Sequence, residues 1–191
     1  LQAAGRLDGA RVRLADANPD LVGCYTMLRD RVEEVIAALD TLAAHHRAEG
    51  EAFFYEVRDE RFNPARAAAP GVYTPELAAM LIYLNRTGFN GLFRLNRRGE
   101  FNVPAGRYEN PRISDPAHLR RVAAALRAPG VTIELGAFAE SMAGAGAGAF
   151  LYCDPPYAPL SKTASFASYT ADGFGAADHA RLRDAIVSAA E

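Results

Sequence analysis

The 191-residue sequence predicts an α/β protein with an open sheet, and two observations support this fold class. Short apolar runs at 11–16, 131–135 and 149–153 alternate with segments whose apolar residues recur at helical spacing. This alternation is typical of strands joined by helices. Hydrophobic residues make up 50% of the chain, which favours a packed domain over a disordered one.

The N-terminal part is predicted to hold one strand and two helices. Residues 11–16 form a strand with an acidic end. Pro19 begins a helix that extends to about residue 28. A second helix follows, because apolar residues recur at helical spacing across 32–43, and it ends at 45–50.

The middle of the chain carries weaker signals. Residues 53–63 are aromatic and charged and fit neither pattern, and 64–73 form a connection rich in Pro and Ala. Thr74 fits the N-cap of a helix that begins at Pro75, because proline is favoured in the first helical turn. Beyond this helix, a turn between two extended segments of 85–108 predicts a hairpin.

The C-terminal part returns to alternating elements and defines the domain organisation. A helix capped at 114–116, the strands 131–135 and 149–153, and a closing helix over 176–190 are predicted. Residues 53–112 interrupt the alternation and are therefore predicted to be an inserted lobe. The segments 1–52 and 113–191 would then form one main domain.

Two acidic residues stand directly at the ends of predicted strands. Asp16 ends the first strand, and Asp154 follows the third. Ligands of open α/β sheets bind beyond the carboxyl ends of the strands. Asp16 is therefore placed to accept hydrogen bonds from ribose hydroxyls, and capping of the helix at Pro19 is an equal alternative.

The motif Asp154-Pro155-Pro156-Tyr157 is the most informative feature of the chain. Two prolines fix φ and remove backbone donors, so the Asp154 carboxylate and the Pro155 carbonyl can both accept hydrogen bonds from one NH₂ group. Tyr157 offers a flat face on which a ring can stack. A nitrogen held in this way can turn its lone pair toward an electrophile, as methyl transfer to an amine requires. The alternative is an ordinary proline-rich surface turn.

Charge points to a nucleic-acid partner only through its distribution. The net charge is −2, which by itself does not indicate such a partner. Between residues 86 and 112, however, six arginines and only two glutamates are interleaved with Phe, Asn and Tyr. This pattern favours a nucleic-acid surface, and a solvated charged face is the alternative.

Other composition features exclude several classes of protein. Cys24 and Cys153 have no paired spacing, which indicates a reducing, cytoplasmic setting, and Cys153 is expected to be a buried small residue. No run approaches the ~20 apolar residues that a membrane span needs. The four histidines lack the spacing of metal ligands, so no metal is expected.

Four blocks of the sequence, in this order, resemble the Dam-like (α-group) DNA adenine N6-methyltransferases: LADANPDL (14–21), YLNRTGFNGLFR (83–94), GEFNVPAGRY (99–108) and YCDPPYAPLS (152–161). The resemblance covers nearly the whole chain. It implies a Rossmann-like, S-adenosylmethionine-dependent methyltransferase sheet with an inserted target-recognition lobe. It also implies a monomer without an obligate protein partner that methylates the N6 amine of adenine in double-stranded DNA, in the site GATC.

The resemblance assigns roles around the sheet edge. Residues 154–157 would hold the target adenine, flipped out of the duplex at a cost of about a few kcal/mol. The methyl group would pass directly from sulfonium to nitrogen, and positioning would supply most of the rate. Asp16, Asp154 and Phe138 would contact S-adenosylmethionine, and an ordinary core aromatic is an equally good explanation of Phe138.

The resemblance places DNA contacts between residues 86 and 108. Arg94 is predicted to donate two hydrogen bonds to a guanine, worth roughly 1–3 kcal/mol of discrimination, and a phosphate contact is the alternative. Phe89 is expected to enter the space left by the flipped base. Glu109 departs from the family pattern, since a basic residue often follows the tyrosine. The predicted DNA-binding set is Arg86, Phe89, Asn90, Leu92, Arg94, Pro104, Arg107 and Tyr108.

One missing feature leaves other functions open. Members of the family carry a Phe-x-Gly-x-Gly loop on the first strand, and this sequence does not contain it. The chain is therefore expected to be an internal fragment that binds the cofactor weakly. A fragment that only binds DNA is one alternative. The other alternative is methyl transfer to an amino group of RNA or protein. Glutamine methyltransferases, however, typically show Asn-Pro-Pro-Tyr where this sequence has Asp-Pro-Pro-Tyr.

Overall fold

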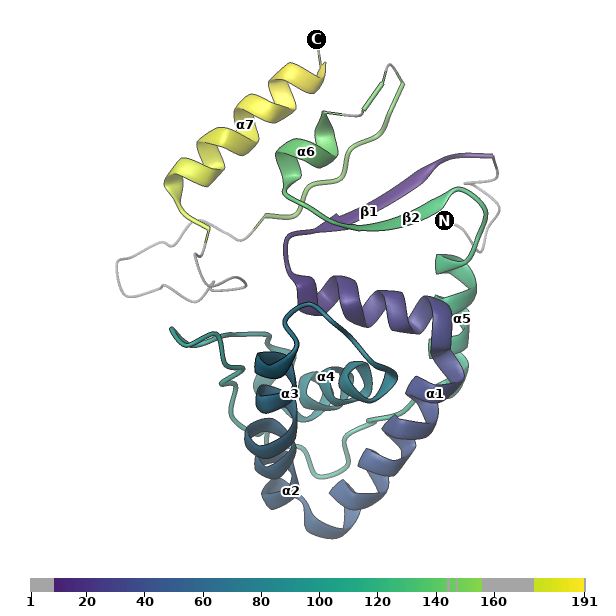
Figure 1. The fold of residues 1–191 in the computed structure, drawn as a ribbon, viewed down its shortest axis with the longest axis vertical. Helices are drawn as coiled ribbons and strands as arrows, with labels where there is room; N and C mark the ends of the chain where they lie inside the picture. The colour runs from purple at the N-terminus through teal and green to yellow at the C-terminus, as the bar shows by residue number, and fades with distance from the viewer. Residues whose placement is uncertain (1–8, 144, 147, 156–173, 191) are drawn as a thin grey trace.

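A computed structural model of the chain describes residues 9–143, 145–146, 148–155 and 174–190. Figure 1 shows two regions, a small sheet with two helices beside it and a larger lobe made of helices and loops. One long helix lies with its first half below the sheet and its second half in the lobe, so it joins the two regions.

Two strands pair in parallel. β1 (Val12–Asp16) and β2 (Val131–Leu135) run in register, with Asp16 opposite Leu135. Of the three predicted strands, those at 11–16 and 131–135 are therefore confirmed. Their carboxyl ends meet at one edge of the sheet. α6 (Phe138–Met142) and α7 (Ala176–Ala190) lie on the side of the sheet away from the lobe (Figure 1).

The third predicted strand is wrong. Residues 149–153 pair with neither β1 nor β2, and Phe150 and Tyr152 are 87% and 79% exposed. Cys153 is exposed as well, not buried as expected. A strand needs a neighbour that satisfies its backbone N–H and C=O groups, and within the described residues this segment has none. Asp154 therefore does not follow a strand here.

α1 (Pro19–Glu49) combines the first two predicted helices. The backbone leaves helical φ and ψ only at Arg31, which falls in the gap between the two predictions. The Asn18 side chain caps the helix by accepting a hydrogen bond from the Asp20 N–H. Asn18, not Asp16, is therefore the N-cap, and that alternative for Asp16 is wrong.

Residues 51–68, where no helix was predicted, form a nearly continuous helical segment. It consists of α2 (Glu51–Glu56), the π-helix η2 (Val57–Phe62) and α3 (Asn63–Ala68). The first part of the predicted Pro- and Ala-rich connection is thus helical. Pro64 is the second residue of α3 and directly follows the π turn that the Asn63 N–H closes with the Arg58 carbonyl.

The main core lies inside the helical lobe. α4 (Pro75–Thr87), capped by Thr74 as predicted, packs along α1, and α5 (Pro116–Leu126) packs on another part of α1. The fully buried aromatic residues of this core are Phe53, Phe54, Phe62, Tyr83 and Phe101.

The predicted hairpin is present in a reduced form. After the short 3₁₀ helix η3 (Phe89–Gly91), the chain turns back on itself through one isolated bridge between Leu95 and Phe101. The Asn102 N–H donates to the Arg94 carbonyl at 3.1 Å. We call residues 94–103 the recognition hairpin, after the role that the sequence predicts for it.

No helix within the described part of the chain is both long and apolar enough to cross a membrane.

Candidate functional site

The carboxyl edge of the sheet brings Asp16 beside the start of the loop after β2. The Gly136 N–H donates to the Asp16 carbonyl at 3.1 Å. The Asp16 side chain is exposed, and its Oδ1 accepts the Asn18 N–H at 2.7 Å. Among the described residues its Oδ2 has no hydrogen-bond partner, which leaves one carboxylate oxygen available for a ligand.

Asn18 carries an unsatisfied donor next to this edge. The residue is 2% exposed, and its Nδ2 has no hydrogen-bond partner among the described residues. Buried polar groups in folded proteins are nearly always paired, and an unpaired one costs free energy. A polar ligand that supplies an acceptor would satisfy this nitrogen, so the edge fits a ligand with ribose or carboxylate oxygens.

Phe138 begins α6 close to the same edge. It is half-buried, and its ring meets the ring of Phe174 edge-on at a centroid distance of 6.1 Å. Phe174 in turn meets His179 of α7 at 4.9 Å. Phe138 thus packs in an aromatic cluster between α6 and α7, and its contact with a cofactor stays a prediction.

Only half of the Asp-Pro-Pro-Tyr motif falls within the described residues. Asp154 is exposed, Pro155 is half-buried, and Asp154 forms no ion pair with another described residue. Pro156 and Tyr157 lie outside the described residues. The predicted roles of these four residues therefore stay predictions.

Seven of the eight predicted DNA-binding residues are exposed, and Arg94 alone is half-buried. Phe89 is 48% exposed on η3, and Asn90 beside it adopts a left-handed φ of 53°. The Asn85 side chain donates to the Gly91 carbonyl and closes this turn. The turn therefore presents an aromatic ring to solvent on a constrained backbone.

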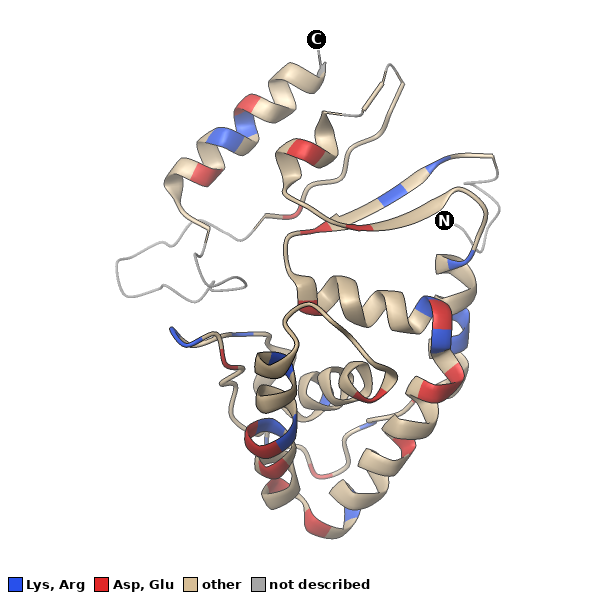
Figure 2. Ribbon diagram, in the orientation of Figure 1, with Lys and Arg blue, Asp and Glu red and all other residues tan. Residues whose placement is uncertain are grey.

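Arg94 is held across the recognition hairpin. Its Nε donates to Asn102 Oδ1 at 2.8 Å, and its Nη2 donates to the Asn102 carbonyl at 3.1 Å. These bonds use two of the five N–H donors of a guanidinium, so the others remain for a base or a phosphate. Figure 2 shows further basic residues at the hairpin tip, where Arg97 and Arg98 are exposed.

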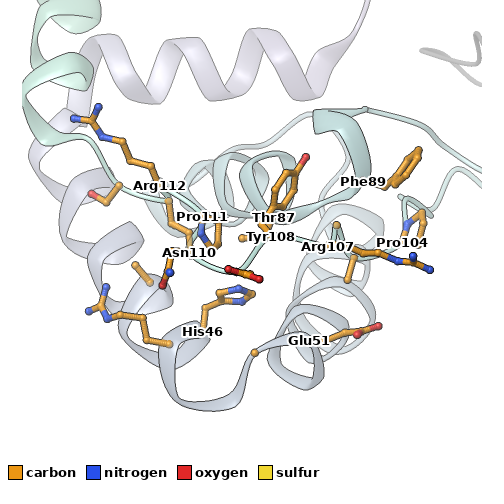
Figure 3. Close-up of a pocket in the computed structure, with 18 of the residues that line it drawn as sticks. His46, Glu51, Thr87, Phe89, Pro104, Arg107, Tyr108, Asn110, Pro111 and Arg112 are labelled. Atoms are coloured by element: carbon orange, nitrogen blue, oxygen red, sulfur yellow. The ribbon is translucent and has the colours of Figure 1, made fainter.

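A cavity of about 1370 Å³ gathers several of these residues. It lies between the last turns of α1, the end of α4 and residues 104–116. Figure 3 shows Phe89, Pro104 and Arg107 together at one end and Arg112 at the other. An antiparallel bridge between Gly88 and Ala105 joins the segment that carries Phe89 to the segment that carries Pro104 and Arg107.

Sequence reasoning missed several residues of this cavity, His46 among them. His46 Nδ1 and the buried Tyr83 hydroxyl lie 2.8 Å apart, and burial lowers the pKa of His46 below its ordinary value. In the sequence, His46 is part of the predicted helix end at 45–50 and carries no signal of a site. Three arginines and three acidic residues line the cavity, so its charge is balanced: Arg47, Arg107, Arg112, Asp40, Glu51 and Glu109.

Within the described ranges, no three His, Cys, Asp or Glu side chains are arranged to hold a metal ion.

Comparison with known proteins places these features in a family. Residues 2–190 match the family model for D12 class N6 adenine-specific DNA methyltransferases. Among curated relatives, a type II methyltransferase M.MjaIII of Methanocaldococcus jannaschii is 40% identical over 176 residues, 90% of this chain and 59% of that protein. The DNA adenine methylase of Escherichia coli K12 is 38% identical over 177 residues, 93% of this chain and 60% of that protein.

A third relative gives the same result. The type II methyltransferase M1.LlaDCHI of Lactococcus lactis subsp. cremoris is 36% identical over 169 residues, 88% of this chain and 57% of that protein. The chain thus spans about three fifths of the length of these relatives. It belongs to the D12 class of N6 adenine-specific DNA methyltransferases.

Proposed function

We propose that this chain carries the DNA-reading and methyl-transfer residues of an enzyme that methylates the N6 amine of adenine in duplex DNA, in the site GATC. The observation that carries the proposal is the grouping of exposed Phe89, Arg107 and Tyr108 around one cavity next to a hairpin with an arginine-rich tip. Relatives named DNA adenine methylase support the choice of substrate.

The target adenine would be held by the motif at 154–157. Its N6 hydrogens would bond to the Asp154 carboxylate and the Pro155 carbonyl, and Tyr157 would stack on the ring. As a new N–C bond forms at N6, the S–CH₃ bond of the donor breaks, and N6 afterwards releases one proton. The residues contribute by holding the lone pair of N6 in line, which lowers the entropic part of the barrier.

S-adenosylmethionine supplies the methyl group as a sulfonium, and we propose that the carboxyl edge of the sheet holds it. The exposed Asp16 carboxylate suits the ribose hydroxyls, and the unpaired Asn18 Nδ2 suits an acceptor of the cofactor. Phe138 lies close in sequence to the same edge. In the whole protein we expect a Rossmann-like sheet with residues 53–112 as its target-recognition lobe, acting as a monomer.

The experiment is labelled methyl transfer to a GATC duplex and a GTTC duplex, with the chain alone and with its full-length gene product. We expect transfer to GATC only. In the active protein, Asp154→Ala should lower transfer by at least ~100-fold, comparable to removing one aligned hydrogen-bonding group from an active site. Its DNA affinity should stay within about threefold, because the flipped base is the only part of the DNA that Asp154 would contact.

The matched control is Cys153→Ala, which changes the exposed neighbour of Asp154 and should keep full activity. Asp154→Ala with normal transfer would refute the role of the motif. DNA binding without transfer to any duplex would support the alternative of a DNA-binding protein, and transfer to RNA or protein would support the other alternative.

A further inference from the structure

A buried ion pair links the first turn of α1 to α3. Arg66 donates from Nε to Asp20 Oδ1 at 2.8 Å and from Nη2 to Asp20 Oδ2 at 2.5 Å. The two side chains are only 14% and 7% exposed. The Tyr73 hydroxyl donates a third bond to Asp20 at 2.9 Å, and burial raises the pKa of Tyr73, so this hydroxyl stays protonated.

Asp20 is also connected to the carboxyl edge of the sheet. Its N–H donates to Asn18 Oδ1 at 2.9 Å, and the Asn18 N–H donates to Asp16 Oδ1 at 2.7 Å. A hydrogen-bonded path therefore runs from Asp16, at the end of β1, to the Arg66 guanidinium. Asp20 is favoured at this place by the partial positive charge of the helix N-terminus.

Arg66 reaches the recognition hairpin with its remaining terminal nitrogen. Its Nη1 donates to the Gly99 carbonyl at 2.8 Å, in the turn of the hairpin. Gly99 has a φ of 76°, a left-handed conformation that glycine adopts without strain. In Figure 1, α3 lies between the start of α1 and this turn. One guanidinium thus joins the edge with Asp16 and Asn18 to the segment that we expect to read DNA.

Two other side chains of the 51–68 segment hold the same edge of the hairpin. Alternate residues of an extended chain present their backbone groups on one edge, and here that edge has no strand partner among the described residues. The three contacts fall on residues 99, 101 and 103: Arg66 with the Gly99 carbonyl, the Asn63 amide with both the N–H and the carbonyl of Phe101, and Arg58 with the Val103 carbonyl.

The π-helix sets the spacing of these side chains. The Asn63 N–H bonds to the Arg58 carbonyl across η2, five residues apart, and both side chains point to the hairpin backbone. Single π turns are frequent at functional sites of α-helices. Among the described residues, the other side-chain hydrogen bonds of Arg58 go to its neighbour Asp59. Of the three side chains, Arg66 is the one that hydrogen-bonds to a described residue of α1, Asp20.

We propose that Arg66 is a positioning residue that couples cofactor binding at the strand edge to DNA reading by the recognition hairpin. The proposal rests on the proposed function. All three guanidinium nitrogens of Arg66 donate hydrogen bonds, two to Asp20 of α1 and one to the hairpin, so that this buried side chain would hold the two elements in one relative position. Ordering of the Asp16–Asn18 edge by cofactor would then favour the hairpin position that binds the target site, and DNA would favour cofactor binding by the same factor.

The test measures this factor in the full-length gene product. The dissociation constant of a GATC duplex is measured with and without S-adenosylhomocysteine, which occupies the cofactor site without turnover. We expect the wild type to bind at least about fivefold more tightly with it, the lower end of typical coupling. Arg66→Ala should bring the ratio close to one. Arg66→Lys keeps the charge but cannot span both partners, so it should give an intermediate ratio.

Arg58→Ala is the matched control, because it frees the same hairpin edge without touching α1. Both Arg58→Ala and Arg66→Ala should weaken discrimination between GATC and GTTC, because each frees the hairpin edge, but Arg58→Ala should keep the wild-type ratio. An unchanged ratio in Arg66→Ala and Arg66→Lys, or an equal loss in Arg58→Ala, would overturn the inference. If Arg66→Ala does not fold, Arg66→Lys and Arg58→Ala decide.

The proposed function fails in a different way. A wild type that transfers methyl groups but shows a ratio of one overturns the coupling and leaves the function standing. A wild type that transfers to no duplex overturns the proposed function itself.

Discussion

The helical lobe and the sheet region differ sharply in how they bury their apolar residues. The lobe encloses Phe54, Tyr83 and Phe101 almost completely. In the sheet region, Leu135 of β2 is 58% exposed, and Phe150 in the nearby chain is more exposed still. A helix satisfies its own backbone and needs only one face covered, whereas a strand needs a neighbouring strand for its backbone groups, and a parallel sheet is normally covered on both faces. The lobe therefore closes a core within the described residues, and the two strands do not.

The largest expected effect comes from replacing one phenylalanine in each region by alanine and comparing the losses in the free energy of unfolding. Phe54→Ala removes a fully buried ring of α2 and should lower the free energy of unfolding by about 3–5 kcal/mol. Phe150→Ala removes an exposed ring and should change it by no more than about 0.5 kcal/mol. Urea denaturation of both variants measures the two values. Equal losses would mean that Phe150 is buried in solution and that the contrast is wrong.

The contrast also explains which elements the sequence predicted. α4 was located through the Thr74 cap and Pro75, because both signals act within a few residues. The run at 149–153 has the composition of a buried strand, but pairing depends on neighbours that local sequence does not encode. Local patterns thus located α4 and the two strands that pair with each other, and failed at 149–153, which has no partner strand among the described residues.

The segment 51–68 shows a second limit. Phe54 and Val57 follow helical spacing, but the π-helix shifts the next buried residue to Phe62, five positions on. That shift breaks the 3.6-residue period by which a helix is recognised in a sequence. Pro64 then resembles a helix breaker in the sequence, although the helical backbone continues through it from η2 into α3.

A smaller effect is expected at the border of the lobe, where half-buried His46 faces the cavity. Burial lowers the pKa of His46 in the folded protein below its ordinary value of 6.5. The unfolded chain then binds the proton more readily, so stability falls as the pH drops from about 6.5 toward the lower pKa of the folded state. Thermal melts between pH 5 and pH 8 should show this decline in the wild type and a flatter profile in His46→Gln.

Tyr83→Phe serves as the control for this pH dependence. It removes the hydroxyl that lies 2.8 Å from His46 Nδ1 but keeps the ring. The decline should persist in this variant, because burial and not the hydrogen bond lowers the pKa. A flat profile in Tyr83→Phe would contradict that cause.

The site was predictable only as far as its residues cluster in sequence. The motif blocks place the predicted DNA-binding set in two stretches, 86–94 and 104–108, and the structure leaves nearly all of that set exposed. His46 lies 37 positions before its partner Tyr83, and Asp20 lies 46 before Arg66. Neither pair has a local signature, since an isolated histidine or ion-pair partner looks the same in a sequence whether it is buried or solvated.

The smallest effect is expected from the ion pair that joins the two strands on the exposed sheet. Arg13 Nε donates to Glu134 Oε2 at 2.7 Å, and Arg13 lowers the pKa of Glu134. Both side chains are exposed, so water and salt screen their attraction and little stability is gained. Glu134→Gln should therefore shift the melting temperature at pH 7 by no more than about 2 °C, and the shift should vanish in 1 M NaCl. Because the pKa of Glu134 is lowered, the small contribution is present above its ordinary value and is lost as the pH falls below it. A large shift that persists in salt would show that the sheet is covered in solution, and the difference between the two regions would then disappear.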